Sequence, residues 1–487
     1  MRYSLTEFRC ACVQYLSTIS LMSLRSYGRH VGVAAPTEKK KLELIDEIVG
    51  ILTGELQPVA RATKGAPVKD DFVDPKIELK IAQLRREYLT EPEPNPIGMF
   101  TSEERESFLV FNDSAFAENE EDGICSSIFR GQLESFKNVP CLLPLDGDLQ
   151  KPKLVIRVED IHAKGLCEGD VVACYAEQYN DYLLVSKINT INGLVVGTGS
   201  RFKFEEEPLL SPNVKLPIAN NKNPTAEEKY LDWLLPIGIG QRCLVSSPPK
   251  TGKSNFLFNL MKSISRETSK YEVFALLIDQ SPELIARYRN AMPSENVIAT
   301  TYDADADMHV FMAEFMLKRM KRFAEVGRNV ILIVDSLSKI AHAYNDTEFS
   351  MGGKCLPCGL ETKTLHYIKK FLATARSFGE KGSLTMIASV SFGTGDEADD
   401  ILYSELSAVA GGEIRLCEDL AVKRLFPAID LLRSHFEGGD ALMDQQRLTC
   451  DRLLRQKVLP KMEADEVHRL ILSCDSLDEL CERLEKL

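Results

Sequence analysis

The chain has 487 residues, more than one hydrophobic core ordinarily holds, which predicts about two to four domains. Its composition, 44% hydrophobic and 27% charged, is typical of soluble globular proteins, and no apolar run is long enough to predict a membrane span. The net charge of −13 excludes nucleic-acid binding by a uniformly basic surface, although a local basic groove remains compatible with it.

Residues 17–56 predict a small helical module. Two short helical patterns, at residues 21–28 and 41–52, flank a turn rich in glycine and proline. Apolar residues of the second pattern recur at the spacing that makes one helix face. Residues 1–20 have no evident place in this arrangement; Glu7 and Arg9 and the lack of a clear cleavage site predict a cytoplasmic protein.

Residues 57–120 predict a linker that is partly disordered. Prolines recur there, charge is mixed and periodicity is lost, apart from one short helix expected near residues 76–88.

Residues 121–204 predict a small β-barrel. Short β-rich runs alternate there with Gly-Asp and Asn-Asp turns, as in "VEDIHAKGLCEGDVVACYAEQYNDYLLVSKINTING". A barrel of the OB type is the first interpretation, and a β-sandwich adaptor is the alternative.

Residues 220–487 predict an open α/β sheet. Continuous apolar runs such as "QRCLVSSPP", "EVFALLID", "NVILIVD" and "SLTMIASV" are typical of strands buried on both faces, and helical stretches separate them. Nucleotide sites of such sheets lie at the carboxyl ends of the strands.

A phosphate-binding loop follows the first of these strands. The segment "SPPKTGKSNF" contains the G-K-S triplet Gly252, Lys253 and Ser254, although Ser247 replaces the first glycine of the general motif. In such a loop, main-chain N–H groups cradle phosphate, a lysine adds charge and a serine ligates Mg²⁺. The strand "VILIVD" ends in Asp335, the carboxylate expected to complete the Mg²⁺ shell, although a helix-capping role is the alternative.

These motifs together resemble a known family. The segments "LLPIGIGQRCLVSSPPKTGKS", "LLIDQSPEL", "IATTYDADADMHVFMAE", "VILIVDSLSKIAHAYN" and "VKRLFPAIDLLRS" occur in the order and at roughly the spacing found in transcription termination factor Rho. The resemblance implies a multidomain chain: a helical N-terminal module, an OB-like RNA-binding barrel and a RecA-like ATP-binding domain with C-terminal helices. It further implies a hexameric ring with Mg-ATP at the subunit interfaces, single-stranded RNA in the pore, and RNA polymerase as a partner.

The resemblance also assigns site residues. Phe426 matches the aromatic residue that stacks on adenine, and Asp335 matches the acidic strand end. The remaining nucleotide-site positions are Gly238, Gly240, Gln241, Arg242, Lys250, Thr251, Gly252, Lys253, Ser254, Asn255 and Ser281.

The catalytic position departs from the family. There "LLID" is followed by a glutamate that orients the attacking water and then by an arginine, whereas this chain has Gln280 and Ser281. Glutamine can hydrogen-bond a water but cannot take its proton, so general-base assistance is lost. Asp279 is expected to point to the other side of the strand, and Glu283 is the nearby carboxylate that could substitute.

Four further positions concern ATP hydrolysis or RNA binding. The arginine that acts in trans in the family falls at Glu437, which leaves Arg424 or Arg433 as a shifted finger. Glu397 replaces a pore-loop lysine, while Lys354 is retained as an RNA contact. In the barrel, the expected stacking rings are replaced by aliphatic Leu142 and Leu143. Three strand tyrosines are alternative stacking or core residues: Tyr175, Tyr179 and Tyr182.

Three hypotheses remain open. The first is a divergent termination factor, an RNA-dependent ATPase and helicase with weakened hydrolysis and translocation. The second is a catalytically inactive relative that uses ATP as an assembly ligand and regulates transcription, for example within a mixed ring with another Rho. The third is a protein-docking module that binds no nucleic acid.

Overall fold

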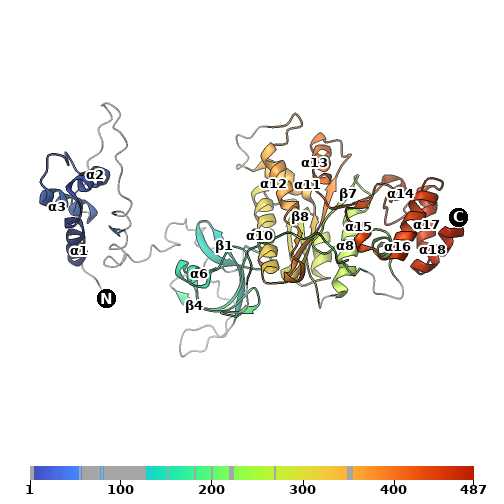
Figure 1. Cartoon of the computed structure of the whole chain (residues 1–487), viewed down its shortest axis with the longest axis horizontal. Coiled ribbons are helices and arrows are strands. Elements are labelled where there is room, and N and C mark those ends of the chain that lie inside the picture. Colours follow the sequence, from blue (N-terminus) through green and yellow to red (C-terminus); the bar gives the residue numbers. More distant parts are fainter. Residues whose placement is uncertain are drawn as a thin grey trace. The chain divides into compact units, whose positions relative to one another are not determined.

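The structure is a computed structural model of the whole chain (Figure 1). It describes residues 5–53, 128–149, 153–179, 182–198, 201–218, 224–267, 270–347 and 355–486, with the single positions 56, 77, 80, 81 and 151. The chain divides into two compact units, Met1–Thr101 and Ser102–Leu487. Most of the expected linker at 57–120 lies outside the described residues, as does Lys354. Within the described part, every helix is too short or too polar to cross a membrane.

The first unit contains a three-helix arrangement of α1 (Leu5–Ser17), α2 (Leu21–Val31) and α3 (Lys41–Leu52). Ser20 caps α2 by accepting a hydrogen bond from the Ser23 N–H, and Gly32 ends the helix in the left-handed conformation. Helix α1 was not expected from the sequence, yet its Cys12 and Leu16 are fully buried in the shared core. Residues 5–17 therefore belong to the helical unit.

The second unit begins with a small barrel. Its elements are β1 (Phe129–Phe136), β2 (Val139–Leu143), β3 (Leu154–Val155), α6 (Val158–Lys164), β4 (Val171–Tyr179), β5 (Tyr182–Ile191) and β6 (Leu194–Val195). The sheet has the order β3-β2-β1-β4-β5-β6, and an additional parallel pairing of β3 with β5 closes it on itself. The helix between the third and fourth strands ends at Gly165, whose φ is 61°.

An α/β domain follows the barrel. Its strands are β7 (Arg242–Ser247), β8 (Glu272–Gln280), β9 (Val297–Thr301), β10 (Asn329–Asp335), β11 (Arg376–Ser377), β12 (Ser383–Ser391), β13 (Gly412–Arg415) and β14 (His435–Phe436). Its helices are α7 (Ala226–Trp233), α8 (Lys253–Ile264), α9 (Pro282–Arg289), α10 (Ala306–Glu325), α11 (Leu337–Asp346), α12 (Thr362–Leu372), α13 (Glu397–Ser407), α14 (Glu418–Val422), α15 (Gly439–Leu442), α16 (Gln445–Leu453), α17 (Ala464–Ser473) and α18 (Leu477–Lys486).

The strands of this domain form an eight-stranded mixed sheet with the order β14-β13-β7-β12-β10-β8-β9, and β11 pairs with β12. The six strands from β13 to β9 run parallel, so their carboxyl ends meet at one edge. Helices α10 to α13 pack on one face, whereas α7 to α9 and α16 to α18 pack on the other (Figure 1). The continuous apolar runs of the sequence are explained by this burial on both faces.

The barrel packs on α10 through a buried polar cluster centred on Arg319. This side chain is 1% exposed and donates to the side-chain oxygen of Gln132 at 2.6 Å and to the carbonyls of Glu295 and Leu145, each at 2.8 Å. Gln132 on β1 donates in turn to the Phe315 carbonyl at 2.7 Å. Apolar contacts of the barrel with α10 surround this cluster, so the two modules share one core.

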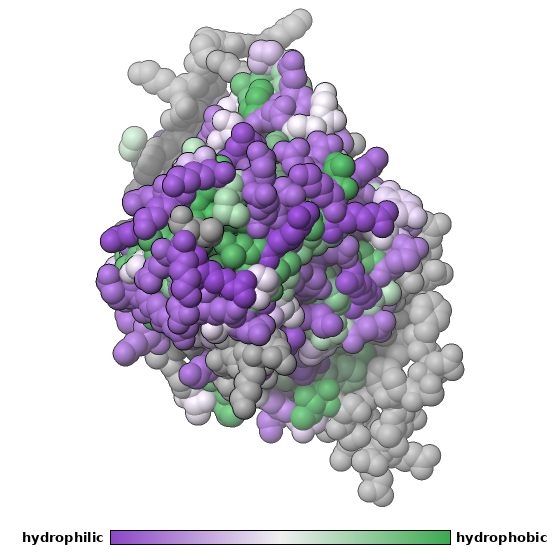
Figure 2. All heavy atoms as spheres, turned by 90° about the vertical axis from the view of Figure 1, so that its right-hand side faces the viewer, coloured by the Kyte–Doolittle hydropathy of each residue, from purple (hydrophilic) through white to green (hydrophobic). Residues whose placement is uncertain are grey.

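The C-terminal helices present a largely hydrophilic face. Figure 2 views the protein from their side and shows hydrophobic side chains gathered in patches among hydrophilic ones. Among the described residues, Val422, Phe426 and Leu432 are exposed apolar side chains, 75%, 47% and 64% exposed.

Candidate nucleotide site

The expected phosphate loop connects β7 to α8 at the carboxyl edge of the sheet. Two of its residues adopt left-handed backbone conformations, Lys250 with φ 63° and Gly252 with φ 87°. A Cβ atom at Gly252 would lie 3.0 Å from the Phe426 ring, so glycine is favoured both by the backbone and by this close approach. The structure thus places Phe426 directly against the loop.

Lys253, at the start of α8, faces the ends of two neighbouring strands. Its Nζ donates to the Ser391 hydroxyl at the end of β12 at 2.9 Å and lies 4.0 Å from Asp335 at the end of β10. Burial lowers the pKa of Lys253, against the attraction of Asp335 and Asp399. The amine is therefore held between the ends of β12 and β10, beside the phosphate loop.

Asp335 and Ser254, the two residues expected to bind Mg²⁺, are in direct contact. The Asp335 side chain is 1% exposed, and its Oδ2 accepts a hydrogen bond of 2.7 Å from the Ser254 hydroxyl. Its Oδ1 accepts a second hydrogen bond, of 2.9 Å, from Ser389 on β12. A hydroxyl and a fixed carboxylate at a phosphate loop are hard oxygen ligands that suit Mg²⁺, so these residues fit that ion.

Gln280 lies at the end of β8, beside the same edge. Its Nε2 donates to the main-chain carbonyls of Asp335 at 3.1 Å and Ile278 at 3.3 Å. Both partners can only accept, so the amide group, rather than the carbonyl oxygen, must face them. A carboxylate could not make these contacts, which means that the position is adapted to glutamine.

The two neighbouring carboxylates, Asp279 and Glu283, have other partners in this chain. A β-bulge between Leu277 and Gln280 sets Asp279 at φ 54° and turns its carboxylate to Lys339 on α11, 2.7 Å away. Glu283 is exposed in the first turn of α9, where main-chain and Ser281 hydrogen bonds lower the pKa of its carboxyl. Neither carboxylate contacts the Ser254–Asp335 pair.

Ser281 serves as the N-cap of α9. Its hydroxyl accepts a hydrogen bond of 3.3 Å from the Leu284 N–H. Of the other residues expected at the site, Thr251 stabilises the loop and Asn255 lies on the surface. Thr251 is buried and donates to the Pro248 carbonyl at 2.9 Å, whereas Asn255 is exposed and accepts from Arg287 at 2.6 Å.

The segment from Gly238 to Arg242 lies at the amino end of β7, opposite the phosphate loop. Gln241 Oε1 accepts from the Gly238 N–H at 2.7 Å, and its Nε2 donates to the Gly411 carbonyl at 2.9 Å. Gly240 has φ 83°, and a Cβ there would lie 2.6 Å from the main chain of Ser377. Within one chain, the structure does not bring these residues to the phosphate loop.

The candidate arginines are on the surface. Arg424 is exposed with φ 56°, two residues before Phe426, and Arg433 is exposed, 3.7 Å from Asp430. Glu437 is also exposed, and its N–H donates to the Gly411 carbonyl at 2.9 Å. In the part of the chain that the structure describes, no hydrogen bond or ion pair joins these three side chains to Asp335, and their role in trans stays a prediction.

The barrel residues considered for base stacking are mostly in its core. Leu142 and Leu143 are 1% and 0% exposed, so neither can contact a ligand on the surface. Tyr182 is buried and Tyr175 is half-buried. The side chain of Tyr179 lies outside what the structure describes, so its role stays a prediction.

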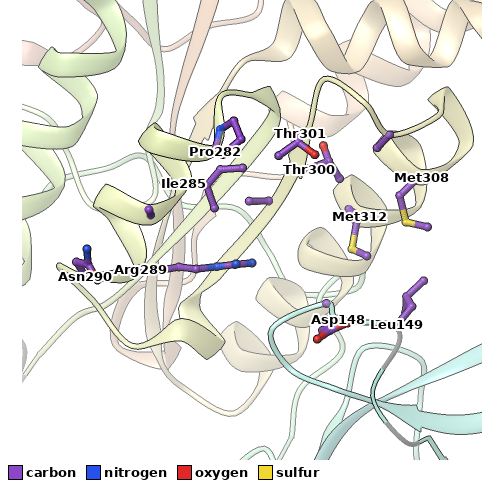
Figure 3. A pocket seen from close by; sticks show the side chains of 14 residues that line it. Asp148, Leu149, Pro282, Ile285, Arg289, Asn290, Thr300, Thr301, Met308 and Met312 are labelled. Atoms are coloured by element: carbon purple, nitrogen blue, oxygen red, sulfur yellow. The ribbon is translucent and has the colours of Figure 1, made fainter.

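A cleft of 710 Å³ lies between the β2–β3 loop of the barrel, the end of β9 and helices α9 and α10, and no residue of the phosphate loop lines it (Figure 3). Figure 3 shows the Arg289 side chain extending across it towards Met308 and Met312. The sequence carries no local signal for this cleft, because its walls come from segments about 150 residues apart.

Comparisons with known proteins agree with this geometry. Residues 228–435 match the model of the ATP synthase alpha/beta family, nucleotide-binding domain. Transcription termination factor Rho of Escherichia coli (strain K12) is 34% identical over 293 residues, which cover 60% of this chain and 70% of that protein. Rho of Haemophilus influenzae is 34% identical over 297 residues, with coverages of 61% and 70%.

Among solved structures, a prototypical ATPase from the type III secretion system of pathogenic bacteria is similar with a TM-score of 0.46 and 22% identity, covering 57% of this chain and 86% of that chain. The Rho relatives are sufficiently identical over enough of their length to assign the family. The phosphate loop, the Ser254–Asp335 pair and the mixed sheet are those of a P-loop ATPase. The chain therefore belongs to the transcription termination factor Rho family.

Proposed function

We propose that this protein is a Rho-type transcription termination factor that binds Mg-ATP and single-stranded RNA as a ring but hydrolyses ATP weakly. The observation that carries the proposal is the Gln280 amide, which is held against the carbonyls of Asp335 and Ile278 while the metal pair Ser254–Asp335 is intact. Nucleotide binding and general-base catalysis are thereby separated: the groups for the first are present, and the proton acceptor for the second is absent.

Two losses set the scale of the expected rate. A positioned general base contributes about 10²–10⁴-fold to rate. An arginine finger contributes about 10³–10⁵-fold. Glu437 has the opposite charge to such a finger, so a neighbouring chain would supply repulsion unless Arg424 or Arg433 takes its place. Weak turnover follows from either loss, and helicase and translocase action weaken with it.

The ring and RNA assignments rest on the family. The Rho relatives support a homo-hexameric ring, or a mixed ring with another Rho, in the cytoplasm, with RNA and RNA polymerase as partners. The pairing of β3 with β5 and the helix between β3 and β4 are consistent with an OB-type barrel. Because Leu142 and Leu143 are buried and Glu397 is acidic, we expect RNA binding to be weak and to use other barrel or pore-loop residues, including Lys354.

The alternative is a catalytically inactive relative that uses ATP as an assembly ligand and regulates transcription. The specific observation in its favour is the adaptation of the β8 end to glutamine, because an amide that satisfies two carbonyls is a stable replacement for a base.

The deciding experiment measures ATP turnover with and without a long pyrimidine-rich RNA, beside direct Mg-ATP binding. Tight binding with turnover that is weak but RNA-stimulated supports a weakened motor. Tight binding with no turnover above that of Lys253→Ala supports the assembly-ligand alternative. Strong RNA-stimulated turnover would contradict both, and absence of Mg-ATP binding would overturn the nucleotide site itself.

A further inference from the structure

The loop between β12 and α13, residues 392–396, begins at the nucleotide site. Ser391, the last residue of β12, accepts the hydrogen bond from Lys253 and donates its own N–H to the Ser338 hydroxyl at 3.0 Å. Phe392 follows, and its N–H donates to the Ser247 carbonyl at 3.1 Å, in the phosphate loop. The start of this loop is therefore hydrogen-bonded to Lys253 and to the end of β7.

The other end of the loop is tied to α11 through a histidine–aspartate pair. His342 Nε2 lies 3.0 Å from Asp399 Oδ1, in the first turn of α13. The second oxygen of Asp399 accepts a hydrogen bond of 2.7 Å from the Thr394 hydroxyl, within the loop. Asp400 accepts from the Gly393 N–H, also at 2.7 Å. One carboxylate oxygen of Asp399 thus contacts His342 on α11, and the other contacts Thr394 in the loop.

We propose that His342 is a positioning residue whose protonation sets how firmly residues 392–396 are held, and through Ser391 the placement of Lys253. With a proton on the imidazole, the pair is an ion pair with a charge-assisted hydrogen bond. Without it, the pair is a neutral donor on a carboxylate, which is weaker. The proposal rests on the geometry of this chain and not on ATP turnover.

The charges around His342 come from three elements. On α13, Asp399 and the exposed N-cap residue Asp396 attract its proton. On its own helix, Lys339 opposes protonation. Lys253 of the phosphate loop faces Asp399 and stabilises that carboxylate.

The pKa values of His342 and Asp399 are both shifted in the direction that favours the ion pair. The hydrogen bond to Asp399 raises the pKa of His342 above its ordinary 6.5, although burial opposes the shift. Burial acts to raise the pKa of Asp399, but hydrogen bonds from His342 and Thr394 hold it below its ordinary 3.8. The stabilisation of the loop by the ion pair is therefore complete below the ordinary histidine pKa. It is lost as pH rises through the raised pKa of His342. In acid, the same stabilisation is lost as pH falls through the lowered pKa of Asp399.

The test is amide hydrogen exchange of the full chain from about pH 5.5 to about pH 8.5, with each rate corrected for the intrinsic effect of pH. We expect protection of residues 392–400 to fall with rising pH, by up to about tenfold for each unit by which the folded pKa exceeds its ordinary value. His342→Gln should remove this pH dependence, and His342→Arg should keep high protection throughout the range. His366→Gln changes an exposed histidine on α12 and should behave as the unaltered protein.

The readout separates a folding defect from a local effect. Amides of β10, which is in the core, report global stability and should remain equally protected in all four proteins. Flat protection of residues 392–400 in the unaltered protein would overturn the proposal, and so would an unchanged pH dependence in His342→Gln. A pH response that disappears after chelation of divalent ions would also overturn it, because a metal bound among His342, Asp396 and Asp399 would then be responsible.

Discussion

The Gln280 side chain donates a hydrogen bond to the main-chain carbonyl of Asp335 across 3.1 Å, joining the ends of two neighbouring parallel strands. The position at which the resemblance implies a catalytic glutamate therefore holds two strand ends together in this chain. Because the same Asp335 binds Ser254 through its side chain, the amide lies next to the Ser254–Asp335 pair without contacting it through that carboxylate.

Gln280→Glu should increase ATP turnover and lower stability. The introduced carboxylate restores a proton acceptor, but without nucleotide it faces the carbonyls of Ile278 and Asp335. We expect turnover to rise at least about tenfold. We expect the free energy of unfolding of the nucleotide-free protein to fall by about 1–2 kcal/mol. Phosphate release and denaturant unfolding measure these two effects.

The double variant Gln280→Glu with Glu437→Arg should exceed the single variant, because it also supplies a cation for a neighbouring subunit. Adding Lys253→Ala to the double variant is the control for contaminating ATPase. Turnover that stays at the level of the unaltered protein in both variants would show that other groups limit hydrolysis.

Ser254→Ala should weaken Mg-ATP binding selectively. The hydroxyl is the partner of Asp335 and the expected Mg²⁺ ligand, so its removal should cost about 10–100-fold in affinity in the presence of Mg²⁺. Binding of ADP in EDTA should change little, because the phosphate-cradling main chain is retained. Calorimetry with and without Mg²⁺ distinguishes the two, and equal losses in both conditions would argue against a metal-ligand role.

Phe426→Ala should weaken adenine nucleotide binding without unfolding the protein. The ring lies against Gly252 and is 47% exposed, so it contributes little to the core and is available for stacking. Aromatic stacking on a base is worth about 1–3 kcal/mol, which corresponds to about 5–150-fold in affinity. Phe426→Tyr should retain affinity, and Leu432→Ala is a control at another exposed apolar residue. An unchanged affinity in Phe426→Ala would show that the ring does not touch the base.

Arg319→Met should uncouple the barrel from the ATPase domain. The substitution keeps most of the volume but leaves acceptors on Gln132, Leu145 and Glu295 without their donor. We expect a loss of about 3 kcal/mol and a separate unfolding transition of the barrel in calorimetry. The control is Lys321→Ala, on the same helix as Arg319. It removes a more exposed ion pair with Glu205 and should cost at most about 1 kcal/mol. A single transition with unaltered midpoint in Arg319→Met would contradict this role.

The sequence by itself determined the parts of the fold that depend on local pattern. The apolar runs "QRCLVSSPP", "EVFALLID", "NVILIVD" and "SLTMIASV" correspond to four neighbouring strands of the sheet, because strands buried on both faces need continuous apolar residues. The phosphate loop and its acidic partner were predictable for a related reason: glycine, lysine and a strand-end acid are required by backbone conformation and phosphate chemistry.

Only the tertiary structure decided the features that join distant segments. Gln280 and Asp335 are 55 residues apart, and His342 and Asp399 are 57 apart, so neither pair has a local signature. The place of α1 depended on burial of Cys12 and Leu16 against other helices, and the turn of Asp279 depended on a bulge between paired strands. Local sequence specifies propensity and periodicity, whereas the partners of a side chain are set by packing and strand order, which emerge only when the whole chain is folded.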